Sequence, residues 1–191
     1  MKDNTKNVYQ FKITLKEIRP LIWRRIIVPE NYSFWDLHVA IQDAMGWTDT
    51  HLHEFLVNVP GSNSIVSIGI PDEDDIEFGE EIMPGWEIKI KKFFSPENKI
   101  ANYIYDYGDY WQHKIELEKI MPAEKDINYP ICIAGKRACP PEDCGGSFGY
   151  EEIIKGESEF QEEYSDYDPE YFSTDEVIFD DPAKRLKFLL R

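Results

Sequence analysis

The stretch YIYDYGDYWQHKIEL, residues 103–117, decides the fold class that the sequence predicts. Large side chains alternate with other residues up to Tyr107, and the alternation resumes from Trp111 to Leu117. Two alternating runs on either side of a glycine-containing turn are typical of a β-hairpin, whose two strands are antiparallel. The stretch therefore predicts an antiparallel sheet.

The same two-residue periodicity predicts further strands on both sides of this hairpin. Near the start of the chain, Tyr9, Phe11, Ile13 and Leu15 alternate with polar side chains. Most connections are shorter than the dozen or so residues that a parallel crossover needs. With the hairpin, the predicted strands cover residues 9–15, 21–28, 51–57, 65–70, 86–90, 103–107 and 111–117.

Three helices complete the predicted secondary structure. Residues 34–45 carry apolar side chains at helical spacing, between a suitable N-cap at Ser33 and a suitable stop at Gly46. A second helix is predicted over residues 150–163, and Pro182 opens a third. The sum is an α+β fold with a largely antiparallel sheet of about seven strands and about three helices.

Length and composition narrow the class of protein. The chain has 191 residues, of which 42% are hydrophobic, and a formal net charge of −16. These values indicate one compact domain over residues 1–191, with residues 1–7 expected to be disordered. No apolar run reaches the ~18–20 residues that span a bilayer, and the first residues form no signal-peptide core. We therefore expect a cytoplasmic protein without membrane contact.

The negative charge is concentrated in two segments. Residues 142–181, the acidic C-terminal segment, hold fifteen acidic residues and one basic residue, and residues 72–81 hold seven acidic residues and no basic one. The rest of the chain carries +5. The simplest interpretation is that acidic side chains cover solvent-facing surfaces. Alternatives are a partner-binding surface and a segment that imitates the charge of DNA. The total charge argues against a nucleic-acid partner without excluding contact by the basic body.

His51 and His53 fall on one face of the predicted strand over residues 51–57. Two imidazoles about 7 Å apart along a strand suit two ligands of one metal ion. They equally suit two partly buried histidines at the margin of the core. The pattern alone leaves both interpretations open.

Asp106, Asp109 and His113 lie around the turn of the hairpin. Aspartate in a glycine-containing turn commonly binds local backbone amides. His113 shares a face with Trp111 and Ile115, which places it at the edge of the core, and a carboxylate close to it would set its tautomer. The group therefore suits a structural turn as well as an acid–base site.

The loop CPPEDCGG, which begins at Cys139, is expected to have a fixed shape because its prolines stiffen the backbone. Cys139 and Cys144 stand at the wide end of zinc-ligand spacing, but a zinc site would need histidines from elsewhere. With Cys132, the odd number of cysteines predicts reduced thiols. A shaped loop without metal that presents Glu142 and Asp143 to a pocket is the simpler interpretation.

Several catalytic motifs are absent from the sequence. It contains no phosphate-binding G-x-x-x-x-G-K-[ST] or G-x-G-x-x-G loop, no G-x-S-x-G elbow and no H-E-x-x-H motif. Nothing in it supports a nucleotide-dependent enzyme, an α/β-hydrolase or a zincin.

Taken in order, these motifs resemble the plasmid pRiA open-reading-frame-three-like family, which is related to passenger proteins of insertion elements. The resemblance covers about residues 8–180 and is most specific in the Asp-Tyr-Gly-Asp-x-Trp-x-His motif and the Cys139 loop. Tyr107 departs from it, since phenylalanine is expected there. The resemblance implies one compact α+β domain and fixes no activity or cofactor. The matching residues, taken as candidate site residues, are His51, His53, Asp106, Asp109, Trp111, His113, Glu142, Asp143 and Gly145.

Two functions of different class remain open. The first is a non-catalytic binding or regulatory module with a protein partner, favoured by the missing catalytic motifs and the many aromatic residues. The second is a divalent-metal-dependent hydrolase, phosphodiesterase-like, which requires its carboxylates to converge on one cavity. The sequence leaves the metal, any cofactor and the oligomeric state open. For the hydrolase, the assigned residues are Asp106, Asp109, Glu142 and Asp143 as cation ligands and His113 or His53 as general acid or base, with His113, Glu142 and Asp143 as the catalytic set.

Overall fold

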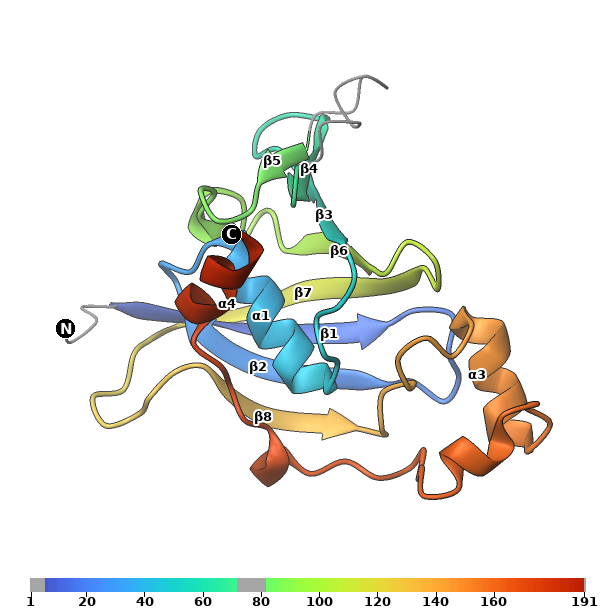
Figure 1. Cartoon of the computed structure of the whole chain (residues 1–191). Coiled ribbons are helices and arrows are strands. Elements are labelled where there is room, and N and C mark those ends of the chain that lie inside the picture. Colours follow the sequence, from blue (N-terminus) through green and yellow to red (C-terminus); the bar gives the residue numbers. More distant parts are fainter. Residues whose placement is uncertain (1–5, 72–81, 191) are drawn as a thin grey trace.

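The computed structural model describes residues 6–71 and 82–190, which contain one eight-stranded sheet (Figure 1). Its strands are β1 (Asn7–Leu15), β2 (Trp23–Pro29), β3 (His53–Asn58), β4 (Ile65–Gly69), β5 (Ile82–Pro84), β6 (Ile100–Tyr105), β7 (Trp111–Pro122) and β8 (Ile131–Lys136). They lie in the order β5-β4-β3-β6-β7-β1-β2-β8. Every neighbouring pair is antiparallel except β4 and β5. The largely antiparallel sheet that the sequence predicts is confirmed.

The strands β6 and β7 form the predicted hairpin. Tyr105 lies opposite Trp111 and Tyr103 lies opposite His113. All four side chains are buried, because residues two apart on a strand face the same way and this side of the hairpin faces the core. The Asp106 carboxylate closes the turn, where it accepts a hydrogen bond from the backbone N–H of Gly108 at 2.8 Å.

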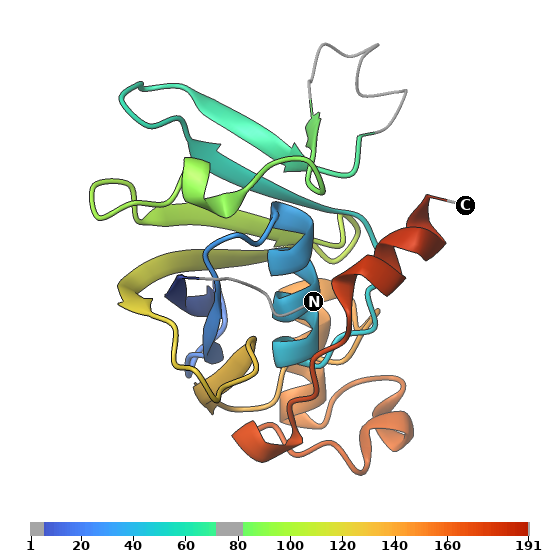
Figure 2. The same cartoon turned by 90° about the vertical axis from the view of Figure 1, so that its left-hand side faces the viewer.

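The helix α1 (Phe34–Met45) lies across one face of the sheet and confirms the predicted helix (Figure 2). The Ser33 hydroxyl accepts from the backbone N–H of Asp36, and the Asp36 carboxylate accepts from the backbone N–H of Ser33. This capping box satisfies two N–H groups that a helix start otherwise leaves unpaired. Gly46 ends the helix in the left-handed region, at φ 93°.

The helix α4 (Pro182–Leu189) begins where the sequence predicts it. Pro182 stands in the first turn, where its missing N–H costs no hydrogen bond. The Asp181 carboxylate caps this end by accepting from the backbone N–H of Ala183 at 3.0 Å.

The helix expected over residues 150–163 is wrong at both ends. The observed helix α3 runs over Gly146–Lys155. Gly156 stops it at φ 75°, a backbone conformation that glycine adopts without strain. Residues 161–164 form a separate 3-10 turn.

The strand expected at residues 86–90 is also wrong. The backbone N–H of Ile90 donates to the carbonyl of Tyr32, and the carbonyl of Ile88 accepts from the backbone N–H of Phe34. These backbone groups therefore bind the start of α1 instead of a neighbouring strand. The sequence pattern also missed β5, which has only three residues, and β8, which lies in a stretch rich in proline and glycine.

The expected disorder of residues 1–7 is wrong for its last two residues. Asn7 opens β1, and its side chain donates to the Glu30 carboxylate at 3.1 Å. The carbonyl of Lys6 accepts from the backbone N–H of Ala123 at 3.0 Å. Residues 1–5 and the acidic loop at 72–81 lie outside the described residues.

The core lies between α1 and the sheet, and the helices α1 and α4 lie on the same side of the sheet (Figure 2). Phe11, Leu37, Phe55 and Ile115 are fully buried there. Each such side chain contributes roughly 1.5–3 kcal/mol by leaving water. The protein is thus a single compact α+β domain. Among the described residues, no helix combines the length and apolar character needed to cross a membrane.

The acidic segment over residues 142–181 lies against the body of the protein. The ring of Phe172 stacks on the buried guanidinium of Arg24, 3.7 Å from the ring centroid. Glu170 pairs with Arg137 at 2.6 Å. Most of the other acidic side chains in the segment are exposed. This arrangement agrees with acidic side chains on solvent-facing surfaces.

Candidate functional site

Three connecting segments meet beyond the ends of β3, β6 and β7. The first leads from α1 into β3, the second is the turn between β6 and β7, and the third is the Cys139 loop between β8 and α3. Their meeting brings together a set of titratable side chains from distant parts of the sequence. These are His51 from the first segment, Asp106 from the second, and Glu142 and Asp143 from the third.

The imidazole of His51 lies among three carboxylates. Its Nε2 is 3.0 Å from Asp143 Oδ1, 3.7 Å from Asp106 Oδ2 and 3.9 Å from Glu142 Oε2. One ligand atom from each of His51, Asp106 and Asp143 can be chosen so that all lie within 4.8 Å of one another. Ligand atoms that share one cation through bonds of about 2.1 Å lie at most about 4.2 Å apart, so a small inward movement of these side chains would let them bind one ion.

The Nε2 atom of His51 is buried and makes no hydrogen bond, although Asp143 Oδ1 is only 3.0 Å away. A hydrogen bond requires the N–H to point along the line to its acceptor. Asp143 Oδ1 is therefore close to Nε2 but is not its hydrogen-bond acceptor. In the tautomer that carries its proton on Nδ1, the lone pair of Nε2 is free to bind a cation.

Asp106 is held by its own turn. Its backbone lies in the left-handed region at φ 58°, and its N–H donates to the carbonyl of Leu52 at 2.9 Å. Aspartate tolerates this region better than most residues. Since Oδ1 accepts from Gly108, the carboxylate is fixed with Oδ2 near His51.

Glu142 is fixed in the same way, through one of its two oxygens. Oε1 accepts from the backbone N–H of Thr48 at 2.7 Å, from the Thr48 hydroxyl at 3.1 Å and from the Tyr105 hydroxyl at 3.1 Å. Oε2 lies 3.9 Å from His51 Nε2 and makes a longer contact of 3.4 Å with the Tyr105 hydroxyl. Burial and the nearby Glu142 carboxylate raise the pKa of Tyr105, so its hydroxyl remains a hydrogen-bond donor.

Asp109 holds the backbone of the Cys139 loop and does not join the cluster of ligand atoms. Its Oδ2 accepts from the backbone N–H of Gly145 at 3.2 Å. A Cβ on Gly146 would lie 2.7 Å from the carbonyl oxygen of Asp109, so only glycine allows this close approach. The sequence predicts Gly145 as a binding residue, whereas in the structure its backbone N–H donates to the Asp109 carboxylate.

Three of the sequence-predicted residues lie in the core instead. The ring of His53 stacks on that of His38, with centroids 3.4 Å apart. His51 lies outside this stack, before the start of β3. His113 is fully buried, with Nδ1 3.4 Å from the carbonyl oxygen of Tyr103, and Trp111 is buried beside it on β7. Burial lowers the pKa of His113 to about 3.

A buried polar network beneath α1 was missed by the sequence patterns. The Tyr103 hydroxyl bonds to His38 Nδ1 at 2.8 Å and accepts from the Gln42 amide at 2.9 Å, and His38 Nε2 lies 2.7 Å from Asp49. His38 and Gln42 stand one turn apart on a helix, which is the sequence signal for this network. Thr48 and Tyr105, which fix Glu142, carried no comparable signal.

The three cysteines are free thiols, as predicted. Burial raises the pKa of Cys139, and it raises the pKa of Cys144 to about 12. In the metal-free protein both thiols therefore stay protonated near neutral pH. Within the described residues, neither joins a cluster of metal-ligand atoms.

A family model described as plasmid pRiA4b ORF-3-like protein matches residues 7–181. The chain belongs to the plasmid pRiA4b ORF-3-like family. The uncharacterized protein y4hQ of Sinorhizobium fredii (strain NBRC 101917 / NGR234) is 35% identical to it over 150 residues, which are 78% of this chain and 72% of the relative.

A solved structure shares the fold of this pRiA4b ORF-3-like protein. It is the crystal structure of the protein of unknown function MM3350 from Methanosarcina mazei Go1, with a TM-score of 0.84 and 45% sequence identity. The match covers 92% of this chain and 99% of that one. The comparisons thus confirm the family and the α+β fold that the sequence indicated.

Proposed function

We propose that this pRiA4b ORF-3-like protein is a binding or regulatory module that holds one divalent cation. Its ligands are His51, Asp106 and Asp143, with Glu142 beside them. The observation that carries the proposal is the convergence of these groups on His51 Nε2, a buried nitrogen without a hydrogen-bond donor or acceptor partner.

The charge of the cluster favours a cation. Three carboxylates lie within 4 Å of one imidazole nitrogen, and Asp106 is almost completely buried. Carboxylates that are taken out of water are costly unless a positive charge accompanies them. A divalent ion supplies more positive charge than protonation of His51 alone.

The mixture of ligand atoms narrows the identity of the ion. Carboxylate oxygens suit Mg²⁺, Ca²⁺ and Mn²⁺, whereas imidazole suits Zn²⁺, Fe²⁺ and other transition metals. A set of one imidazole and two or three carboxylates satisfies both preferences best with Mn²⁺, Fe²⁺ or Zn²⁺. Mn²⁺ is the most convenient probe among these because it binds both kinds of ligand.

Calorimetric titration of the purified protein with Mn²⁺ tests the proposal. We expect one saturable site per chain, and an affinity at least tenfold weaker in His51→Ala and Asp143→Asn. The matched control is Asp166→Asn, which removes an exposed carboxylate from the same acidic segment outside the cluster. Binding that is absent, or that all three substitutions weaken equally, contradicts the proposal.

A second candidate function is metal-dependent hydrolysis, which the position of Glu142 favours. Asp143 is 71% exposed, so solvent reaches the cluster, and three protein ligands leave positions for water on most divalent ions. Glu142 Oε2 lies 3.9 Å from His51 Nε2, and it would be the general base toward a water held by such an ion. In this candidate, the catalytic set of the sequence keeps Glu142 and Asp143, while His113 lies in the core.

Hydrolysis of bis(4-nitrophenyl) phosphate with and without Mn²⁺ separates the two candidates. A hydrolase shows Mn²⁺-dependent turnover that Glu142→Gln lowers at least a hundredfold while Mn²⁺ affinity changes only a few-fold. Cation binding without turnover favours the binding module.

As the partner of that module we propose a protein, because the acidic surface repels polyanions and α3 exposes Phe148 and Ile154.

A further inference from the structure

The helix α4 is anchored to the body by one guanidinium. Arg185 pairs with Asp43 and with Asp49 across α1 and the following segment, and with Asp180 just before α4. Its Nη1 lies 3.4 Å from Asp49 Oδ2, and its Nη2 lies 2.8 Å from Asp180 Oδ2. Three carboxylates around one arginine make this the densest charged contact of the helix.

The helix α4 buries little of its own surface. The structure describes all of its residues, and none of them is buried. Phe188 is 72% exposed and Leu189 is 39% exposed. A hydrogen bond from the Trp35 indole to the carbonyl of Pro182 also joins the start of the helix to α1. A helix that buries so little surface depends on its anchor to stay in place.

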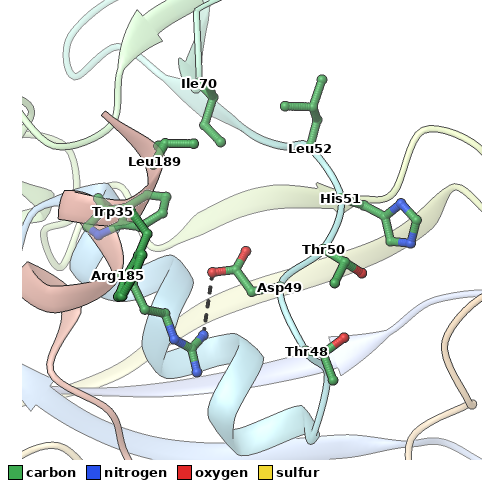
Figure 3. Close-up of a pocket in the computed structure, with 10 residues that line it drawn as sticks. Trp35, Thr48, Asp49, Thr50, His51, Leu52, Ile70, Arg185 and Leu189 are labelled. Carbon is green, nitrogen blue, oxygen red and sulfur yellow. Dashed lines mark hydrogen bonds and ion pairs between the residues drawn. The ribbon is translucent and has the colours of Figure 1, made fainter. Parts of the chain in front are cut away.

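The anchor reaches the segment that builds the candidate cation site. Asp49 lies between Thr48, which donates two hydrogen bonds to Glu142, and His51, which lies among the carboxylates. Figure 3 shows Asp49 and Arg185 pointing toward one another across a pocket, while the ring of His51 points away from it. This pocket has a volume of about 390 Å³ and is lined by both α4 and residues 48–52.

The Asp49 carboxylate is shared between α4 and the core. Its Oδ1 lies 2.7 Å from His38 Nε2, and its Oδ2 faces Arg185. Loss of Arg185 would leave Asp49 with His38 as its remaining side-chain partner. The segment over residues 48–52 would then lose its contact with α4 and would keep the hydrogen bonds of Thr48, Thr50 and Leu52 to Glu142, Tyr105 and Asp106.

We infer that docking of α4 regulates the cation site through the Arg185–Asp49 contact. The inference rests on the proposed function. With α4 docked, residues 48–52 are held in the position that presents His51 to the carboxylates. With α4 released, the segment loosens and cation affinity falls. Linkage requires the reverse as well, so cation binding favours the docked helix.

Hydrogen exchange of the full chain, with and without Mn²⁺, tests this coupling together with Mn²⁺ titration. Arg185→Gln is expected to speed exchange of the Thr48 and Thr50 amides at least tenfold and to weaken Mn²⁺ binding at least fivefold. Asp43→Asn removes one of the three carboxylates that hold Arg185 without touching residues 48–52, and it should act in the same direction to a smaller extent. The matched control, Lys184→Gln, removes a neighbouring cation of α4 and should change neither quantity.

Two results overturn the inference. In the first, Arg185→Gln frees the α4 amides but leaves the amides of residues 48–52 and Mn²⁺ affinity unchanged. In the second, Arg185→Gln leaves α4 as protected as in the unmodified chain. If the unmodified chain binds no Mn²⁺, the proposed function fails, and the exchange of residues 48–52 in Arg185→Gln still decides whether α4 controls this segment.

Discussion

The hydroxyl of Tyr105 donates to the Glu142 carboxylate at 3.1 Å and joins the hairpin to the Cys139 loop. Tyr105→Phe removes this bond and leaves the buried ring in place. We expect the free energy of unfolding to fall by about 1–2 kcal/mol, since the backbone N–H of Thr50 also loses its acceptor. Mn²⁺ affinity should fall three- to tenfold because Glu142 is less firmly held. The control is Tyr110→Phe, at a tyrosine that is 51% exposed; equal effects of the two substitutions contradict this role of Tyr105.

A close backbone approach holds the Cys139 loop against the hairpin turn. Gly146→Ala would place a Cβ 2.7 Å from the carbonyl oxygen of Asp109, at a residue with φ 67°. Gly61→Ala is the matched control, with φ 75° and no atom within 4 Å of the added Cβ. Denaturant unfolding should show Gly146→Ala to be less stable than Gly61→Ala by about 1–3 kcal/mol, because only the former adds a clash to the backbone strain. Equal stability of the two variants argues that the loop adjusts freely.

The buried His113 makes stability depend on pH. Its pKa is lowered to about 3 by burial, whereas the unfolded chain protonates it near its ordinary value of 6.5. Between these values the unfolded state binds the extra proton, so stability is present above pH 6.5 and is lost as the pH falls. From pH 6.5 to 5 the loss amounts to about 2 kcal/mol. His113→Phe should flatten the pH dependence of unfolding in this range by that amount, and an unchanged slope would show that His113 is not the titrating group.

The acidic segment is fastened by Phe172. Its ring stacks on Arg24, and a Cβ on Gly135 would lie 2.2 Å from the ring. Gly135→Ala should therefore displace the ring and cost about 1–2 kcal/mol of stability through the lost cation–π contact. We expect proteolysis of residues 156–181 to be faster than in the unmodified protein in both Gly135→Ala and Phe172→Ala. Protection of this segment in both variants would show that Glu170 and its neighbours fasten it without Phe172.

Local signals made the body of the fold predictable. The hairpin followed from alternation around Gly108, and α1 followed from Ser33 and Gly46, because these elements depend on residues close together in sequence. The strand expected at residues 86–90 failed because its backbone groups bind the start of α1, and no local pattern records a contact of that kind. The strand β5 was missed because its three residues are too few to show an alternation.

The sequence predicted which residues belong to the candidate site, but it did not predict which of them lie close together. Motif residues drew attention to His51, Asp106 and Asp143, which converge, and equally to His53 and His113, which lie in the core. Alternation with apolar neighbours on β3 and β7 indicated burial of these two histidines. The convergence itself depends on the path of the Cys139 loop over the hairpin turn. Sequence spacing carries no information on such a path.

An anomalous difference map from crystals of the protein grown with Mn²⁺ is the most direct test of the cation site. We expect one peak within about 2.5 Å of His51 Nε2, Asp106 Oδ2 and Asp143 Oδ1. The same map from Asp143→Asn crystals should show a much weaker peak. A map of the unmodified protein with no peak at His51, or with its strongest peak elsewhere on the acidic segment, would contradict the claim that these residues form a cation site.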